Sequence, residues 1–577
     1  MGLHKQYLKV GQSARNKLFG VSPFRPRVTT NGSDGTPLQM LISEPKKYFH
    51  GRLALIIVGI VSLIIGIILA YFPWLDYIIL KNLRLRNGTL GFHYWQKPGV
   101  IRLTKLYIFN VTNPDGFLNN GEKPKLNELG PFVYREDMEK VNIAFHENNT
   151  VTFQHKKILH FVPELSSGSR DTTVVVPNIP LLTLSTQSKE LPRIVRMGLS
   201  LMLRSMKMEP FVRVTPEQLA FGYDDTLLTL AYRFFPRHRR PMSKMGLLIG
   251  RNGTINDVTT IFTGHSSMTE FGLMNRLNGL DRLPMWDRHP CDSLRASEGS
   301  FFPPRHFTHE DVVNVWDKDL CRVLPLQFRG NEAKEGISVG HYTPPEDVFA
   351  DPSVRPENGC FCPGENGECP PSGLQNIAPC QYEAPVYLSF PHFYRADPKL
   401  LDAVEGLEPD QKKHETYFKI QPKLGVPLEA QVRVQMNLKV EKVTGIQAVA
   451  KFPDIVFPII WVEEGVAHLT NEIHWWIYLA TTFSDIAAPL VIYGIIAVGS
   501  LFLLVALAGA YRDVVFTPEN IERGKQTLRR GSSFIVNGQH RLLILRDSYS
   551  LLENRHQTVS PTNVVSDAAS SDADPEA

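Results

Sequence analysis

Two uncharged apolar runs, one near each end of the chain, restrict the possible folds more than any other feature. The first covers residues 53–72 and the second covers residues 486–511. Each is long enough for an α-helix to cross the hydrocarbon core of a bilayer, which takes about 20 residues. The alternative is a buried soluble helix, which would have to be enclosed on all sides over this length. We therefore predict two transmembrane helices, at 53–73 and 486–511.

The basic residues around these runs indicate which way the chain is threaded. Lys46, Lys47 and Arg52 precede the first run, and Arg512 follows the second. Cytoplasmic flanks carry the excess of Lys and Arg, so both termini are expected in the cytosol. Basic residues also follow the first run, so this inference needs support. The first run starts too far into the chain for a cleaved signal peptide.

All six cysteines lie in one window between the two runs, which gives that support. They are Cys291, Cys321, Cys360, Cys362, Cys369 and Cys380. Half-cystines gathered in this way are typical of disulfides, which persist in oxidising compartments. Zinc is the rival explanation for the Cys-Phe-Cys sequence, but the even count and the extracytoplasmic setting favour disulfides. Spacing alone leaves many connectivities open.

The glycosylation sequons agree with this topology. Four lie between the apolar runs, at Asn87, Asn110, Asn148 and Asn252, while the sequon at Asn31 lies outside them. We therefore predict a cytosolic tail at 1–52, a disulfide-bonded and glycosylated ectodomain at 74–485, and a cytosolic tail at 512–577. Both tails have the mixed polar composition of disordered segments.

The segment between the runs is mainly of β character. Stretches rich in Val, Ile, Tyr, Phe and Thr alternate with turn signals such as Asn113-Pro-Asp-Gly. Predicted strands include 101–111, 132–162, 171–179, 430–440 and 445–452. The predicted fold class is therefore an α+β membrane protein, in which two transmembrane helices flank a large, mainly β ectodomain.

One stretch, residues 192–208, favours a helix instead, and residues 215–230 favour a second short one. At 100° per residue, Arg193, Arg196, Arg204 and Lys207 form a basic stripe on an otherwise apolar helix. Two interpretations stay open. The stripe is either the solvated face of a core-packed helix or a surface that meets anionic or amphiphilic cargo.

Several motifs together resemble the class B scavenger receptor family. They lie at 106–136 (LYIFNVTNPDGFLNNGEKPKLNELGPFVYRE), 221–225 (FGYDD), 301–307 (FFPPRHF), 360–363 (CFCP), 385–398 (PVYLSFPHFYRADP) and 457–465 (FPIIWVEEG). The family includes the fatty-acid translocase, the lysosomal integral membrane protein and insect sensory neuron membrane proteins. The resemblance runs from the first apolar run through the second, and we expect an insect-type member.

The resemblance implies a specific architecture. It implies the disulfides Cys291–Cys360, Cys321–Cys380 and Cys362–Cys369. It also implies an irregular β-barrel with an apolar tunnel, capped by a small helical bundle at about 188–232. Fatty-acid-binding members engage ligand with two cap lysines, and the matching positions here are Ser205 and Lys207. Half of that pair is therefore missing, although Arg204 lies beside it.

The leading functional hypothesis is capture of lipids, lipoproteins or anionic particles at the cap, with Arg193, Arg196, Arg204 and Lys207 as ligand-binding residues. Hydrophobic cargo would then pass through the tunnel to the membrane. The alternative is an endosomal or lysosomal sorting receptor for a protein cargo, or a vesicle-maturation factor. It rests on an acidic dileucine and a tyrosine-type signal in the tail, at Asp547, Tyr549, Leu551 and Leu552.

The sequence shows no nucleophile elbow, phosphate loop or metal-ligand spacing, so we expect no enzyme, no metal and no cofactor. The expected partners are lipids or lipoprotein particles, the bilayer and clathrin-adaptor proteins that bind the C-terminal tail, but not nucleic acid. Homo-oligomerisation is left open. The expected location is the plasma membrane, the endosome–lysosome membrane, or both.

Overall fold

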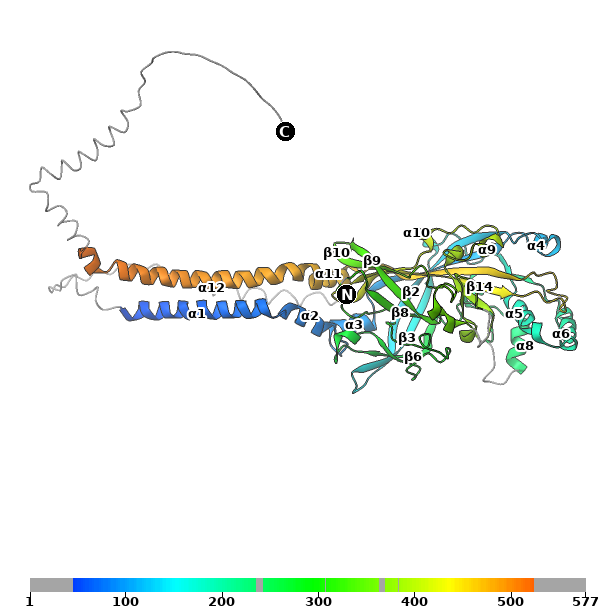
Figure 1. The fold of residues 1–577 in the computed structure, drawn as a ribbon, viewed down its shortest axis with the longest axis horizontal. Coiled ribbons are helices and arrows are strands. Elements are labelled where there is room, and N and C mark those ends of the chain that lie inside the picture. Colours follow the sequence, from blue (N-terminus) through cyan, green and yellow to red (C-terminus); the bar gives the residue numbers. More distant parts are fainter. Residues whose placement is uncertain (1–44, 235–241, 307, 363–368, 382, 524–577) are drawn as a thin grey trace, which may run out of the picture. The chain divides into compact units, whose positions relative to one another are not determined.

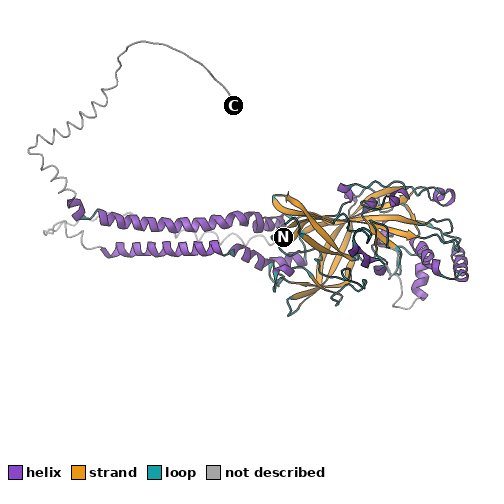
Figure 2. Cartoon of the chain, viewed as in Figure 1, coloured by secondary structure: helices purple, strands orange, loops and turns teal. Residues whose placement is uncertain are grey.

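The computed structural model describes residues 45–234, 242–306, 308–362, 369–381 and 383–523. The chain forms two compact units. The small unit combines Met1–Ile68 with Tyr493–Ala577, and the large unit is Leu69–Ile492. Helices dominate the small unit, whereas strands are the main regular structure of the large one (Figures 1 and 2).

The small unit is built from two long apolar helices that pack against each other. They are α1 (Pro45–Tyr71) and α12 (Ser484–Val515), and both are long and apolar enough to cross a membrane. Their backbones approach closely at Gly59 and Gly499. A Cβ atom added to Gly499 would lie only 3.0 Å from the carbonyl oxygen of Gly59. Small residues allow such approach between membrane helices. An ion pair between Arg52 and Asp513 joins the two helices.

The large unit is organised around one antiparallel sheet. The strands hydrogen-bond in the order β7-β6-β3-β2-β1-β15-β14-β13-β10-β9-β8, and β12 and β11 branch from β14. Their bounds are β1 (Val100–Val111), β2 (Leu126–Phe145), β3 (Thr150–Phe161), β6 (Gly253–Phe262), β7 (Met274–Leu277), β8 (Val312–Asp317), β9 (Arg322–Lys334), β10 (Ile337–Thr343), β11 (Gln375–Asn376), β12 (Val386–Ser389), β13 (Tyr417–Gln421), β14 (Val426–Val440) and β15 (Ile455–Leu469). A separate pair joins β4 (Val174–Pro177) to β5 (Phe211–Val214).

One residue links the two edges of the large sheet. Ser297 forms an isolated bridge with Leu273, which precedes β7, and another with Val315 in β8. The Ser297 amide donates to the Asn314 carbonyl at 2.9 Å, and the Trp316 amide donates to the Ser297 carbonyl at 2.8 Å. Ser297 is fully buried. The strands at the opposite ends of the sheet order are thus connected through this short segment.

Helices lie at both ends of the large unit. Figure 1 shows α5, α6 and α8 together at one end and α2, α3 and α11 at the other. We call α5–α8 the helical group; its bounds are α5 (Ile179–Gln187), α6 (Arg193–Ser205), α7 (Pro216–Phe221) and α8 (Thr226–Phe234). The remaining helices are α2 (Trp74–Leu83), α3 (Leu90–Gln96), α4 (Pro114–Asn120), α9 (Pro398–Asp402), α10 (Gln411–His414) and α11 (Asn471–Tyr478).

The helical group differs from its prediction at two points. It begins at Ile179 rather than near residue 188, because Asn178 caps α5 by accepting a hydrogen bond from the Leu181 amide. The single helix predicted at 215–230 is in fact two helices, α7 and α8. Gly222 breaks it with a φ of 124°, and the Asp225 carboxylate then caps α8 through the Leu227 and Leu228 amides.

The strand predicted at residues 445–452 is wrong. This segment forms successive turns in which Ile446, Val449 and Phe452 each donate to the carbonyl three residues earlier. The same three side chains are buried, so the apolar spacing is three rather than the two of a strand. The alternating appearance of the sequence hides this period.

The six cysteines form three disulfides in the large unit. Cys291 joins Cys360, Cys321 joins Cys380, and Cys362 joins Cys369. These are the pairs that the family resemblance implies. Because the first two close loops of 69 and 59 residues, they restrict the unfolded chain over a long stretch.

Candidate ligand-binding cavity

The large unit contains a cavity of about 970 Å³. This volume lies near the upper end of the range of about 300–1,000 Å³ that is usual for ligand sites. Its lining comes both from the helical group and from strands of the large sheet, including β8, β9, β14 and β15. The lining of the cavity therefore draws on residues of both hydrophobic cores of the unit.

The side of the cavity formed by the helical group is apolar. Leu199, Met202 and Met206 come from the α6 region, and Leu227 and Phe234 come from α8. Six of the thirteen methionines of the chain line the cavity, at positions 138, 202, 206, 242, 245 and 436. Met202 and Met206 lie on this side. Because methionine adapts its shape readily, this side suits hydrocarbon chains of varied conformation.

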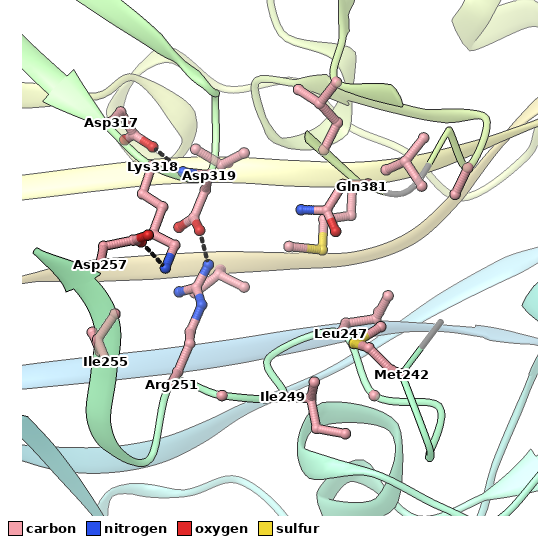
Figure 3. Close-up of a pocket in the computed structure, with 18 of the residues that line it drawn as sticks. Met242, Leu247, Ile249, Arg251, Ile255, Asp257, Asp317, Lys318, Asp319 and Gln381 are labelled. Atoms are coloured by element: carbon pink, nitrogen blue, oxygen red, sulfur yellow. Dashed lines mark hydrogen bonds and ion pairs between the residues drawn. The ribbon is translucent and has the colours of Figure 1, made fainter. Parts of the chain in front are cut away.

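A second side of the cavity carries ten ionisable side chains in the described part of the chain, which we call the charged wall. They are Arg102, His155, Lys157, Arg251, Asp257, Glu298, Asp317, Lys318, Asp319 and Glu464. Figure 3 shows Arg251 reaching Asp319, and Lys318 reaching Asp257. Arg251 also pairs with Glu464, and Lys318 Nζ lies 2.5 Å from Asp257 Oδ2. Wall residues from distant parts of the chain thus neutralise each other.

Two further cations of the wall share one carboxylate. Arg102 Nε lies 2.9 Å from Glu136 Oε2, and Lys157 Nζ lies 2.6 Å from Glu136 Oε1. Lys157 Nζ is also 3.8 Å from Glu464. Burial raises the pKa of Glu136, but the charges of Arg102 and Lys157 outweigh it and hold this pKa well below its usual range. Glu136 is therefore ionised at neutral pH.

Glu298 faces a cation that lies behind the wall. Lys140 Nζ is 3.7 Å from Glu298 Oε1, and His155 Nε2 is 3.5 Å from Glu298 Oε2. Burial opposes ionisation of Glu298, but Lys140 prevails and lowers its pKa to about 2. Burial lowers the pKa of His155, so its imidazole is neutral at physiological pH. The Glu298 region thus combines an ionised carboxylate with a neutral ring.

Asp317 is a wall carboxylate whose hydrogen bonds come from backbone amides. Its Oδ1 accepts hydrogen bonds from the Asp319 and Leu320 amides, both at 2.9 Å. Burial and the neighbouring charge of Asp319 raise its pKa to about 7. At neutral pH its carboxyl group therefore carries a proton for part of the time.

The basic stripe of residues 192–208 is only partly helical in the structure. Arg193 and Arg204 are exposed on α6, whereas Arg196 is half-buried. Lys207 lies beyond the helix, with a φ of 54°. The Lys207 amide donates to the Arg204 carbonyl and the Met208 amide to the Leu203 carbonyl, which is the Schellman pattern that ends helices. Lys207 thus leaves the stripe that helical periodicity assigns to it, while Ser205 is exposed nearby.

The apolar part of α6 is also partly exposed. Ile194 is 80% exposed, Leu201 64% and Met197 60%, whereas Leu203 is buried. At 100° per residue the three exposed side chains form a band beside Arg193 and Arg204. The helix therefore presents apolar and basic groups side by side to solvent, and is not packed into the core around most of its circumference.

Comparison with known proteins matches residues 57–510 to the model of the CD36 family. This chain belongs to the CD36 family. Its curated relatives include scavenger receptor class B member 1 of Mus musculus, which is 35% identical over 67% of this chain and 75% of that protein. The same receptor of Bos taurus is 31% identical over 79% of this chain and 88% of that protein.

Lysosome membrane protein 2 of Homo sapiens is another relative, 33% identical over 74% of this chain and 87% of that protein. The CD36-family chain is therefore a scavenger receptor-like membrane protein and not an enzyme. The more specific prediction of an insect-type member stays a prediction.

The other predicted site residues of this CD36-family chain are scattered. Asn87, Asn148 and Asn252 are exposed, whereas Asn110 is half-buried in β1 and accepts a hydrogen bond from the Val175 amide at 2.8 Å. We expect glycans at the exposed positions more readily than at Asn110. The predicted sorting signal at Asp547, Tyr549, Leu551 and Leu552 lies outside the described residues.

The charged wall is not among the features that the sequence predicts. One signal was present in Glu463-Glu464, because neighbouring residues of a strand face opposite sides. In the structure Glu463 pairs with Arg433 and Lys105, while Glu464 lines the cavity. If two adjacent glutamates lie in a strand of a mainly β domain, at least one of their carboxylates faces the interior. That buried carboxylate needs a cationic partner.

Proposed function

We propose that this chain is a two-span membrane receptor that captures lipids, lipoproteins or anionic particles at the helical group and passes hydrophobic cargo through the cavity to the membrane. Both termini would be cytosolic and the large unit would be the ectodomain. The observation that carries the proposal is a cavity of about 970 Å³ that reaches from α5, α6 and α8 into the strands. A walled path matters because the transfer of a 16-carbon chain from an apolar environment into water costs roughly 12 kcal/mol of free energy.

Two further observations support this proposal. One concerns the tunnel, and the other concerns the surface that would bind the cargo. The Ser297 segment connects the edge strands β7 and β8, as expected if the large sheet closes into an irregular barrel. The exposed band of Ile194, Met197 and Leu201 lies beside basic side chains on α6, as expected for a surface that meets amphiphilic or anionic cargo. Arg193, Arg196, Arg204 and Lys207 remain the proposed ligand-binding residues.

A cavity-filling substitution tests the route. Ala231 on α8 lines the cavity and is half-buried, so Ala231→Trp should fill the passage without disrupting the sheet. We expect cells that carry this variant to bind lipoprotein normally but to take up its lipid several-fold more slowly. The measurement compares bound particles with transferred radiolabelled lipid at equal surface expression.

The matched control is Ala333→Trp, an exposed position that does not line the cavity. Normal lipid transfer by Ala231→Trp, with purified protein that retains no lipid by mass spectrometry, would contradict the proposal.

The second candidate function is an endosomal or lysosomal sorting receptor for a protein cargo, or a vesicle-maturation factor. It is favoured by the likeness to lysosome membrane protein 2 and by the tail signal. Clathrin adaptors would bind that signal, and the exposed apolar band of α6 would bind the cargo.

Replacing Leu551 and Leu552 with alanine tests this alternative. If adaptors read the dileucine, we expect the steady-state distribution of the tagged chain to move from endosomes and lysosomes to the cell surface. Surface biotinylation measures the shift, with Leu542→Ala and Leu543→Ala as the matched control in the same tail. An unchanged surface fraction would count against the signal.

A further inference from the structure

The cavity has two chemically distinct sides. Leu199, Met202 and Met206 represent the apolar side, whereas Arg251 and Glu464 represent the charged wall. A cavity divided in this way fits an amphiphile, with its hydrocarbon chain on the apolar side and its polar head at the wall. The charge of the wall then decides which heads are accepted.

Among the residues that the structure describes, the wall offers no excess of positive charge. The described lining contains four Arg or Lys side chains and five Asp or Glu side chains. Each of the four cations already has a carboxylate partner within 4 Å. Behind the wall, Lys140 and Glu136 add one charge of each sign. An anionic head that enters here would have to compete with carboxylates that are already in place.

We propose that the charged wall makes the cavity selective for lipids whose polar head is uncharged, such as monoacylglycerols or long-chain alcohols, and against the ionised carboxylate of a free fatty acid. This inference rests on the proposed function, because it requires lipid to enter the cavity. A carboxylate that leaves water needs a new cation or several donors to compensate its lost hydration. A hydroxyl head instead donates to the carboxylates of the wall and leaves their ion pairs intact.

The state of Asp317 adds to this selectivity. Because its pKa is raised to about 7, its carboxyl group is protonated for part of the time at neutral pH. A protonated carboxyl group donates a hydrogen bond to an ester carbonyl or a hydroxyl. An ionised head beside it would also meet the charge of Asp319. The charge of Asp319 thus disfavours the ionised head, while protonated Asp317 remains a donor for the uncharged one.

Two ligands with the same acyl chain test the inference. The full chain is reconstituted in lipid nanodiscs, and binding of tritiated 1-monohexadecanoylglycerol and hexadecanoate is measured at pH 8, with empty nanodiscs subtracted. We expect the monoacylglycerol to bind at least about tenfold more tightly. Equal or tighter binding of hexadecanoate would overturn the selectivity while leaving the lipid-receptor function intact. Binding of neither ligand would overturn the proposed function itself.

Two variants assign the selectivity to the wall. Glu464→Gln and Asp257→Asn each remove one negative charge, so each should reduce the preference for the monoacylglycerol by about threefold or more. The partner of Asp257, Lys318, has a side chain that is 60% exposed, so Asp257→Asn should disturb folding little. The control is Glu310→Gln, an exposed carboxylate that does not line the cavity. A folded Asp257→Asn variant with the preference of the control would overturn the role of the wall.

Discussion

Replacing Lys140 with methionine is expected to lower the free energy of unfolding by about 3–5 kcal/mol. Lys140 lies on β2 and is 1% exposed. Its Nζ donates to Ser300 Oγ at 2.7 Å and to the Trp95 carbonyl at 3.1 Å, and it lies 3.7 Å from Glu298 Oε1. Methionine fills much of the same volume but provides no charge and no donor.

The loss comes mainly from Glu298. Lys140 holds the pKa of this buried carboxyl group at about 2, so Glu298 is ionised throughout the physiological range. Without Lys140, the nearest partner of Glu298 is His155, which burial keeps neutral. A buried charge without a partner is among the most destabilising defects in a folded protein.

Because of where Lys140 and Glu298 lie, we expect Lys140→Met to destabilise the large sheet as well. Glu298 and Ser300 lie within three residues of Ser297. Ser297 connects the edge strands β7 and β8. Lys140 therefore ties this connecting segment to β2, an interior strand of the sheet. We expect Lys140→Met to increase hydrogen exchange at the Ser297 and Trp316 amides in addition to lowering the melting temperature.

A double variant separates the lost charge from lost packing. Lys140→Met combined with Glu298→Gln removes both charges, so it should recover most of the stability lost in the single variant. Lys399→Met, at an exposed site, is the control. Equal melting temperatures for Lys140→Met and the control would contradict this account of the pair.

The sequence predicts those features of the fold that repeat along the chain. The two apolar runs identify α1 and α12, and the Val- and Ile-rich stretches identify long strands such as β1 and β14. Each of these signals is local, because a strand or a membrane helix imposes its own period or length on its residues. Such signals do not depend on which strand lies next to which.

Features that depend on tertiary neighbours cannot be predicted from such local signals. The charged wall brings Arg102, Arg251 and Glu464 together from strands and loops that are far apart in the sequence. Lys207 looks helical by periodicity, but it takes the left-handed conformation that ends α6, usually the place of a glycine. Gly222 is visible in the sequence, yet a helix tolerates an isolated glycine. The break there is supported by a tertiary contact, the pairing of Tyr223 with Met245.

Two stacked histidines outside the cavity form a second buried ionisable cluster. The rings of His392 and His414 lie 4.4 Å apart and nearly parallel. His392 Nε2 lies 2.5 Å from Glu128 Oε2, which also accepts from the Trp461 indole at 2.7 Å. The Asp410 amide donates to His414 Nδ1 at 2.9 Å. His414 is 3% exposed, so water does not screen a charge placed on its ring.

Acidification is expected to destabilise the large unit through His414. Burial, followed by the neighbouring His392, lowers the pKa of His414 from 6.5 to about 4. Between these values the unfolded chain binds more protons than the folded one, so stability falls as the pH falls. The stability that depends on neutral His414 is present above about pH 6.5, and about 2 kcal/mol of it is lost at pH 5.

His414→Asn separates this contribution from those of other groups. Asparagine keeps an acceptor for the Asp410 amide but does not titrate, so its melting temperature should fall less between pH 7.5 and pH 5 than that of the unchanged protein. His265→Asn, at an exposed histidine, should keep the full pH dependence. If all three proteins lose the same stability on acidification, the histidine stack does not sense pH. If only His414→Asn resists, the stack limits how far this receptor withstands an acidic compartment.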